Sequence, residues 1–424
     1  MQFALEERLK DHLRQHWVAV MAVLLALLGV WVRVALLQFE SVDYTDHLKP
    51  WFTLLATTPG LEAFRQPTWN YTPPYIYLLK LATIPLADHP LRAIKSLALV
   101  FDAVLVVGVY LLVRHRYPRP VVIPIAAAAV VLFSPTVIFN GALWAQSDAT
   151  YTALLVLCLF AVVRQQNALA FLFFGLAFAF KLQAAFLLPL LGVVYLRRRF
   201  SIVYLLLVLL TYLVLVMPAV LAGMPVKAAL SVYFDQAELY RKLTYGAPTI
   251  YQWLPNDNYD MFVSFGVGLA LAVALAIVSM ALLSRRPLSP DVLIPMALAC
   301  TLVVPFVTPK MQDRYFFPAD VLSIVYAFYL PRRFYVPLIV TLCSLFSYAG
   351  FLFNQTPVPM PFVSLALLVP VVLVVQDYAA ALFARPLSGH PLVAEDQPPV
   401  EVPANGRRAR SRLRPWPGWL LPRG

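Results

Sequence analysis

The hydrophobic residues of this chain fall in long runs that are separated by short polar gaps. The runs occupy residues 17–38, 92–113, 120–139, 149–163, 168–180, 182–196, 201–222, 262–283, 291–308, 317–330, 334–353 and 361–384. Most approach the ~20 residues that a helix needs to cross a bilayer. In lipid the backbone must be satisfied within a helix or a closed barrel, and these runs lack the alternation of barrel strands. The pattern therefore predicts an all-α, polytopic transmembrane helical bundle of about 11–12 spans.

Composition agrees with this fold class. Hydrophobic residues make up 61% of the chain and charged residues 13%, and the mean hydropathy is +0.75. A soluble domain has about a quarter charged residues, so one aqueous core could not bury this much apolar surface. A net charge of +12 would suggest nucleic-acid binding in a soluble protein. Here the positive residues lie in short loops, where they set orientation, so we expect no nucleic-acid partner.

The basic residues of the gaps predict which side of the membrane each gap faces. Arg8, Lys10 and Arg14 place the N-terminus in the cytoplasm, because Lys and Arg concentrate on that side. This assignment requires residues 168–196 to cross twice, with a break at Lys181–Gln183. Each half is shorter than a full span, so we expect the break to line a cavity below the outer surface. The cytoplasmic side then also holds Arg114, Arg116, Arg119, Arg164, Arg197, Arg198, Arg199, Arg285, Arg286, Arg332 and Arg333.

The other gaps then face the outside of the cell. They are residues 39–90, 140–148, 181–183, 223–261, 309–316 and 354–360. The first is long, and its apolar stretches Trp51–Ala56 and Tyr75–Leu86 are too short to span. We expect them to form helices along the membrane surface.

The same reading divides the chain into three parts and gives its location. It predicts a cytoplasmic segment at 1–16, an integral membrane domain at 17–385, and a disordered, basic, Pro-rich cytoplasmic tail at 386–424. We expect a multi-pass protein of the bacterial plasma membrane, in contact with membrane lipids and with its chemistry on the outer face.

Most residues that could carry chemistry lie in the outer gaps, beginning with Asp43 just after the first run. A carboxylate at a membrane surface can accept the proton of a sugar hydroxyl as that hydroxyl attacks. Partial burial would bring its pKa nearer to the working pH. Asp46 lies three residues further on and would share a face with Asp43 if the segment is helical. The alternative is a pair of solvated interfacial acids that end a helix.

A second polar cluster follows the third run, with Asn140, Trp144, Gln146 and Asp148 close together. Ionisable groups at membrane depth are expensive and are functional by default. Asp148 could also cap the next helix through the amides of its first turn. Trp144 could instead be an interfacial belt residue.

Two cationic positions complete the candidates. Lys181, next to Gln183, interrupts an apolar segment and needs either an internal carboxylate such as Asp148 or an anionic ligand such as lipid phosphate. The alternative for Lys181 is that its chain reaches to the interface. Lys310, Asp313 and Arg314 lie at the outer end of another run, where the Arg314 fork matches a phosphate or carboxylate. They could also form a salt-bridged loop.

Several motifs that other chemistries need do not occur in the sequence. There is no P-loop and no dinucleotide-binding glycine pattern, and the six histidines form no metal motif with cysteine. Cys158, Cys300 and Cys343 lie within apolar runs and are expected to be buried thiols. We therefore expect no cofactor and no metal. An energised substrate on the outer face would have to arrive attached to lipid.

With these segments laid out, the chain resembles the GT-C superfamily of polytopic glycosyltransferases, and most closely bacterial proteins similar to GPI mannosyltransferase II. The resemblance covers residues from about 17 to 355, in order. The resemblance rests on the whole set of segments in their order and not on any single one. The segments that carry it are Asp43-Tyr44 with Pro50-Trp51, Asn70–Tyr75, Ala142–Asp148, Phe178–Gln183, Ala247–Gln252 and Arg314–Asp320.

The resemblance implies an enzyme that moves a hexose, often mannose, from a polyprenyl-phosphate donor to an acceptor on the outer face, with inversion. By position, Asp43 would be the catalytic residue. The chain departs from the family pattern at Ala145, where relatives have glycine, and at Asp313, where many have Glu. The residues expected to bind substrate are Asp46, Asn70, Tyr71, Asn140, Trp144, Gln146, Asp148, Lys181, Gln183, Tyr251, Lys310, Asp313, Arg314 and Tyr315.

The expected mechanism has Asp43 deprotonate the acceptor hydroxyl while Lys181, Arg314 or Lys310 stabilises the departing lipid phosphate. The acceptor, whether glycan, lipid or protein, stays open. A multi-span secondary transporter is the main alternative, although transporters place polar groups near the midplane and often have two related halves. A flippase for lipid-linked glycans, with a cationic cavity open to both leaflets, is the next alternative, and a structural scaffold the last.

Overall fold

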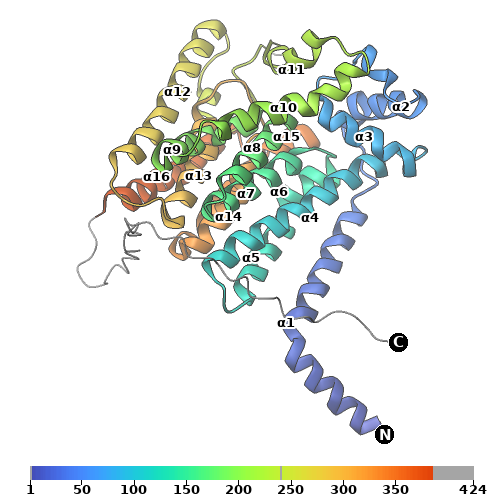
Figure 1. The fold of residues 1–424 in the computed structure, drawn as a ribbon, viewed down its shortest axis with the longest axis vertical. Coiled ribbons are helices and arrows are strands. Elements are labelled where there is room, and N and C mark those ends of the chain that lie inside the picture. Colours follow the sequence, from blue (N-terminus) through green and yellow to red (C-terminus); the bar gives the residue numbers. More distant parts are fainter. Residues whose placement is uncertain (1, 239–240, 385–424) are drawn as a thin grey trace, which may run out of the picture. The chain divides into compact units, whose positions relative to one another are not determined.

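A computed structural model describes residues 2–238 and 241–384 of the chain, and Figure 1 shows their arrangement. The predicted all-α membrane bundle is confirmed: the described residues are mainly helical, with only two two-residue strands. The tail predicted for 386–424 lies outside the described residues. The α-helices are α1 (Gln2–Ala35), α2 (Lys49–Thr57), α3 (Pro73–Leu86), α4 (Pro90–Arg116), α5 (Val122–Leu132), α6 (Pro135–Ile138), α7 (Asp148–Val163), α8 (Asn167–Phe180), α9 (Leu188–Arg198), α10 (Val203–Leu221), α11 (Val226–Glu238), α12 (Tyr259–Leu283), α13 (Pro290–Val307), α14 (Phe317–Tyr329), α15 (Tyr335–Leu352) and α16 (Met360–Phe383).

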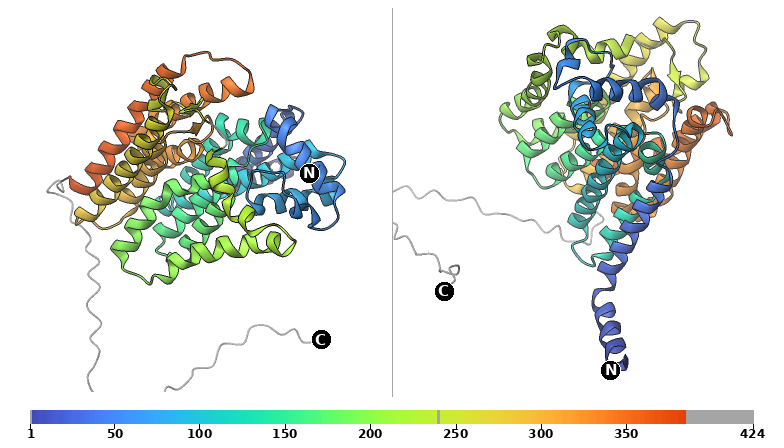
Figure 2. Two further views of the ribbon diagram at one scale, coloured as in Figure 1. Left: turned by 90° about the horizontal axis from the view of Figure 1, so that it is seen from above. Right: turned by 90° about the vertical axis from the view of Figure 1, so that its right-hand side faces the viewer.

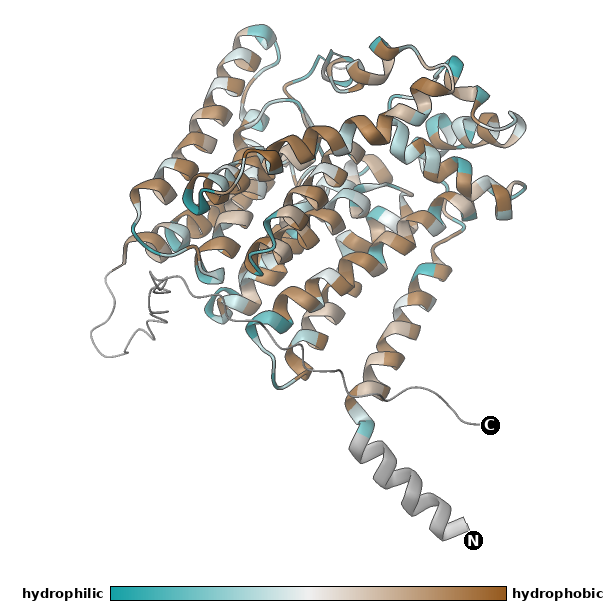
Figure 3. Cartoon of the chain, viewed as in Figure 1, coloured by the Kyte–Doolittle hydropathy of each residue, from teal (hydrophilic) through white to brown (hydrophobic). Residues whose placement is uncertain are grey.

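Many of these helices are built to cross a bilayer. In the described part of the chain seven are long and apolar enough to do so, or up to eight if the bent pair α5 and α6 forms one span. The helices α7, α8 and α14 are apolar but shorter. Most runs predicted from the sequence fall on one helix; the run at 120–139 covers α5 and α6, and the run at 182–196 covers a 3-10 turn and α9. Figure 3 shows the long helices mainly hydrophobic and the connecting turns hydrophilic, so the protein is a multi-pass membrane protein.

The core of the bundle lies around α13, which is buried along most of its length and packs against α12, α14 and α16. The peripheral helices α1, α10 and α12 instead expose rows of large apolar side chains, as expected for faces turned to lipid. The N-terminal part of α1 projects away from the other helices (Figures 1 and 2).

The break predicted at Lys181 is confirmed. The helix α8 ends at Phe180, Lys181 is extended with φ −155° and ψ 135°, and a 3-10 turn η4 (Leu182–Leu187) leads into α9. At the far end of α9, Arg198 donates hydrogen bonds of 2.9 Å to Asn167 Oδ1 and 2.9 Å to Val162 O. The end of α9 therefore returns to the start of α8, and residues 168–196 run out and back as the double crossing requires.

The basic gaps meet at one end of the bundle, where their arginines close helix C-termini. Arg197 donates to the carbonyls of Ala281, Ser284 and Arg286, at 2.6, 3.0 and 2.6 Å. Ala281 lies in the last turn of α12, whose carbonyls have no partner within the helix, and Ser284 and Arg286 follow it; a cation there also complements the helix dipole. The cavity that these loops surround is lined by His115, Val163, Gln165, Arg197, Arg198, Pro287, Leu288, Ser289 and Pro290.

The long first gap forms short helices, as predicted. A π-helical turn η1 (Tyr44–Leu48) leads into α2, and a 3-10 turn η2 (Glu62–Arg65) precedes α3. These elements pack together around the buried side chains of Phe52, Phe64 and Ile76. Their position along the membrane surface stays a prediction.

Two short strands were not predicted. The strand β1 (Thr244–Tyr245) pairs in parallel with β2 (Met311–Gln312), with Thr244 opposite Met311 and Tyr245 opposite Gln312. The pairing ties the segment before α12 to the turn between α13 and α14. A further 3-10 turn, η5 (Ile250–Trp253), follows β1, and a π-helical turn η3 (Phe139–Leu143) and a 3-10 turn η6 (Pro331–Arg333) lie elsewhere in the bundle.

A buried ion pair attaches α1 to the bundle. Arg33 Nε lies 2.8 Å from Asp102 Oδ2 on α4, and Arg33 Nη1 donates to Leu132 O at 2.9 Å and to Gly29 O at 3.2 Å. Both side chains are almost completely buried. Because α1 buries little else, this pair fixes its position along α4.

Removing one partner of this pair is expected to cost far more than removing both. Arg33→Met or Asp102→Leu leaves a buried charge unpaired, which costs about 3–5 kcal/mol, whereas the double variant replaces the pair with apolar side chains and recovers most of the loss. Melting temperatures of the detergent-solubilised variants measure this. A double variant no more stable than either single one would contradict the expectation.

Candidate functional site

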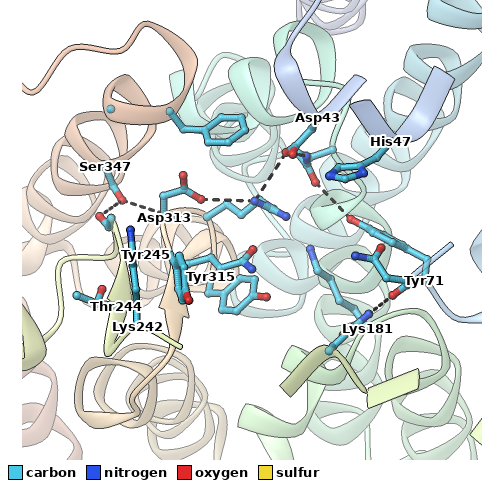
Figure 4. Close-up of a pocket in the computed structure, with 18 of the residues that line it drawn as sticks. Asp43, His47, Tyr71, Lys181, Lys242, Thr244, Tyr245, Asp313, Tyr315 and Ser347 are labelled. Atoms are coloured by element: carbon cyan, nitrogen blue, oxygen red, sulfur yellow. Dashed lines mark hydrogen bonds and ion pairs between the residues drawn. The ribbon is translucent and has the colours of Figure 1, made fainter. Parts of the chain in front are cut away.

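The outer polar clusters of the sequence converge on one cavity of about 490 Å³ (Figure 4). The residues that line it come from the segments around η1, α3, η3, η4, β1, β2 and α15. Segments more than 300 positions apart in the chain therefore contribute to the same space. The lining residues are Asp43, His47, Leu48, Trp51, Asn70, Tyr71, Gln146, Phe180, Lys181, Gln236, Lys242, Thr244, Tyr245, Gly246, Gln312, Asp313, Arg314, Tyr315, Ser347, Gly350, Phe351, Thr356 and Met360.

Asp43 is held through one of its two carboxylate oxygens. Trp144 Nε1 donates to Asp43 Oδ2 at 2.8 Å, and Gln146 Nε2 donates to the same oxygen at 2.6 Å. Among the described residues, none donates a hydrogen bond to Oδ1. The side chain is 19% exposed. Two fixed donors thus orient the carboxylate and leave its second oxygen for a ligand.

The turn that supplies those donors is itself tightly held. The indole of Trp144 stacks on Phe351 with centroids 4.9 Å apart and meets Tyr348 edge-on at 5.3 Å. Ser41 Oγ donates to Trp144 O at 2.9 Å. Between the two donor residues, Ala145 has φ +68°, in the left-handed region that favours glycine. An alanine there costs about 1–2 kcal/mol, which the surrounding contacts must offset.

Asp148 is completely buried beneath the cavity and joins two segments. It accepts hydrogen bonds from Lys181 Nζ through Oδ1 and from Asn140 Nδ2 through Oδ2, the latter at 2.9 Å. The carboxylate partner predicted for Lys181 is confirmed, and Lys181 does not reach to the interface because it is buried. The capping role considered for Asp148 is wrong: the residue is the first of α7 and its side chain makes no cap hydrogen bond, since both oxygens are engaged elsewhere.

The Arg314 side chain lies between three carboxyl groups without forming a hydrogen bond to any described residue. Its nitrogens are 4.0 Å from Asp43 Oδ2, 3.6 Å from Asp148 Oδ2 and 3.5 Å from Asp313 Oδ1. The guanidinium also lies over the ring of Trp144 at 5.3 Å. Burial opposes its charge, but Asp43 and the neighbouring acids hold the pKa of Arg314 well above its usual value. The site therefore contains a permanent cation whose fork is available to a ligand.

Asp313 differs from the other two carboxyl groups in its protonation. Burial raises the pKa of Asp313 to about 7, and Asp43 and Asp148 act in the same direction while Arg314 opposes them. The group is therefore partly protonated near neutral pH.

Other predicted residues complete the wall of the cavity. Tyr71 donates to Gln146 Oε1 at 3.4 Å, and Gln236 donates to the backbone oxygen of Asn70. The ring of Tyr315 lies 5.7 Å from Lys181 Nζ. Asn140 and Trp144 do not line the cavity but support Asp148 and Asp43 from behind.

Besides Asn140, Trp144 and Asp148, four other predicted residues lie outside the lining. Asp46 is exposed and accepts a hydrogen bond from Thr45, so the shared face expected with Asp43 is wrong. The reason is the π-helical turn η1, whose wider turn places position i+4, His47, beside Asp43. The other three are Gln183, which is buried, Tyr251, which donates to Val307 O at 2.8 Å, and Lys310, whose Nζ lies over the Tyr259 ring.

Several lining residues could not be singled out from the sequence. Lys242, Thr244 and Tyr245 lie in the gap at 223–261, which contains many polar residues, and Ser347 lies within a helix otherwise suited to the membrane. The two-residue pairing of β1 with β2 brings the first three to the site, and it is too short to leave a sequence pattern. His47 had one usable signal, its spacing of four residues from Asp43.

Neither a metal site nor a thiol site is apparent. In the described ranges no group of three or more His, Cys, Asp or Glu side chains is arranged to hold a metal ion. The described cysteines, Cys158, Cys300 and Cys343, are free and buried.

Asp313→Asn is expected to stabilise the protein more at pH 8 than at pH 5. The pKa of Asp313 is about 7 in the folded protein, well above the ~3.9 of an unfolded aspartate. The protonated acid therefore contributes stability that is complete below pH ~4 and is lost as the pH rises through about 7. Melting temperatures of wild type and variant at both pH values measure this, and an equal shift at the two would contradict it.

A scan against models of known protein families and a search of curated proteins both find no match to this chain. Its function must therefore be inferred from the cavity. What the cavity offers is a fixed carboxylate with one unengaged oxygen, next to a buried guanidinium whose donors are unengaged by the described residues.

Proposed function

We propose that this protein is an integral membrane glycosyltransferase that moves a hexose from a polyprenyl-phosphate donor to a hydroxyl acceptor, with inversion. The observation that carries the proposal is the position of Asp43. Its Oδ2 is fixed by Trp144 and Gln146, its Oδ1 is unengaged by the described residues, and Arg314 lies 4.0 Å away in the same cavity. A base beside an anion-binding group is what transfer from a sugar phosphate needs.

Asp43 would act as the general base. As the acceptor hydroxyl attacks the anomeric carbon, its proton passes to Asp43 Oδ1. The donors Trp144 and Gln146 keep the carboxylate in one orientation, so little reorganisation is needed in the transition state. In-line attack opposite the leaving phosphate inverts the anomeric centre.

Arg314 and Lys181 would stabilise the departing phosphate. The Arg314 fork can give two parallel hydrogen bonds to phosphate oxygens. The guanidinium stays charged because three carboxyl groups surround it. With Lys242 on the cavity wall, three cations face three acids, and partial protonation of Asp313 leaves an excess of positive charge for the phosphate.

The distribution of charge supports an outer-face site fed from the membrane. The arginine-rich loops meet at one end of the bundle, and positive residues concentrate on the cytoplasmic side. The cavity is built mainly from the gaps that alternate with these arginine-rich loops, and these gaps would face the outside of a bacterial plasma membrane. Since nucleotide sugars are cytoplasmic substrates, a lipid-borne donor, such as polyprenyl-phosphate-mannose, fits that location.

Asp43→Asn is expected to lower hexose transfer by at least about 100-fold, because general-base catalysis contributes about 10²–10⁴-fold. The measurement is transfer from radiolabelled polyprenyl-phosphate-mannose in membranes that contain equal amounts of each protein. The matched control is Asp46→Asn, which changes an exposed acid of the same turn outside the cavity and should leave transfer near wild type.

Undiminished transfer by the Asp43→Asn protein would remove Asp43 from the mechanism. No transfer by the wild type would contradict the proposed donor, and substrate movement across vesicles without transfer would favour a transporter or a flippase instead.

Arg314→Lys is expected to lower transfer about tenfold or more, although the charge is kept. A lysine cannot give the two parallel hydrogen bonds of the guanidinium. The control is Lys310→Gln, which removes a nearby cation that does not line the cavity, and which should have little effect. The steady-state constants for the donor measure both, and a larger loss in the control would contradict the assignment of the phosphate to Arg314.

A further inference from the structure

Asp313 has a carboxyl group that the proposed mechanism does not use. It lines the cavity and is 94% buried, since its exposed fraction is 6%. The backbone amide of Arg314 hydrogen-bonds to the carboxyl group, whereas its buried Oδ1 accepts no hydrogen bond from a described residue and lies 3.5 Å from Arg314 Nη1. A buried carboxyl oxygen without a hydrogen-bond donor is unfavourable, so Oδ1 has unused capacity for a donor from a ligand.

The backbone presents this carboxyl rigidly. The amide of Asp313 donates to Tyr245 O at 2.9 Å, which extends the pairing of β1 with β2. Ser347 Oγ shares its one hydrogen between Gly246 O at 2.6 Å and Asp313 O at 3.1 Å, which holds the two segments to α15. A side chain fixed in this way can select between ligands that differ by one atom, because it cannot follow a missing group.

The neighbours of Asp313 restrict what can bind beside it. Asp43 and Asp313 approach the same nitrogen of the Arg314 guanidinium, Nη1, at 4.0 and 3.5 Å, and Figure 4 shows both carboxyl groups at the cavity. A phosphate placed directly against Asp313 would bring a second anion next to this carboxyl group. A hydroxyl fits, because it can donate to the Asp313 carboxyl and accept from Arg314 at the same time.

We propose that Asp313 is a specificity-determining residue that binds one hydroxyl of the transferred hexose. This inference rests on the proposed function and deepens it, since it places the polyol face of the donor sugar against the turn between β2 and α14. The phosphate side of the sugar then lies toward Lys181, and the reacting carbon lies near Asp43. The side chain of Asp313 takes no part in bond making or breaking.

The test compares donors that each lack one hydroxyl of the hexose. The wild type should use one of these deoxy donors about tenfold or more less efficiently than the parent in kcat/KM, because a lost hydrogen bond to a charged group has about that effect. Asp313→Ala should lower kcat/KM for the parent and leave that one deoxy donor nearly unchanged, so the ratio falls toward one. Asp313→Asn should give an intermediate ratio.

The control variant is Ser347→Ala, which loosens the same turn without removing the carboxyl. Ser347→Ala should lower kcat/KM for all donors alike and keep the ratio of parent to deoxy donor. If Asp313 had only a structural role, Asp313→Ala would give this same result. If Asp313→Ala does not accumulate in membranes, the ratios of wild type and Asp313→Asn decide.

Two results would overturn the inference while leaving the proposed function intact. One is a wild type that uses every deoxy donor as well as the parent, and the other is an Asp313 variant that keeps full discrimination, with transfer still lost in Asp43→Asn. No transfer of hexose by the wild type would instead overturn the proposed function, and the inference with it.

Discussion

The candidate site depends on keeping two cations and three acids together in a space that lipid surrounds. Lys181 is paired with Asp148, and Arg314 is held by Asp43, Asp148 and Asp313 at 3.5–4.0 Å. An isolated charge at this depth would cost several kcal/mol, so neither cation could remain there alone. Asp148 contacts both, through different oxygens. The break of α8 at Lys181 and the turn after β2 are therefore held in place by one buried carboxylate.

The wall of the cavity combines this electrostatic core with ordinary membrane packing. The first gap supplies Asp43 and Tyr71 on short helices that pack around Phe52 and Phe64, and the turn at Trp144 is fixed by stacking on Phe351. The left-handed Ala145 shows that the shape of this turn is kept without a glycine. The surrounding packing thus offsets the conformational strain of Ala145, and such strain is common at functional sites.

Much of the fold and part of the site could be predicted from the sequence. Apolar runs gave the helices, arginine spacing gave the reversal at Lys181, and the need of a buried cation for a partner pointed to Asp148. What escaped prediction depended on local geometry that periodicity does not contain. Because of the π-helical turn η1, His47 lines the cavity and Asp46 does not. The pairing of two two-residue strands brings Lys242 and Tyr245 to the cavity. Neither feature has a sequence signature of its own.

Arg197, which the sequence predicts to help set orientation, also stabilises the fold. Its guanidinium donates to Ala281 O in the last turn of α12 and to Ser284 O and Arg286 O just after that helix, so it ties the end of α9 to the end of α12. Relocating this arginine to reverse insertion would also leave those carbonyls without partners in a region poor in water. If Arg197 sets the orientation as the sequence predicts, moving its charge to the opposite loops would also cost stability. An inverted relative would have to rebuild its helix ends.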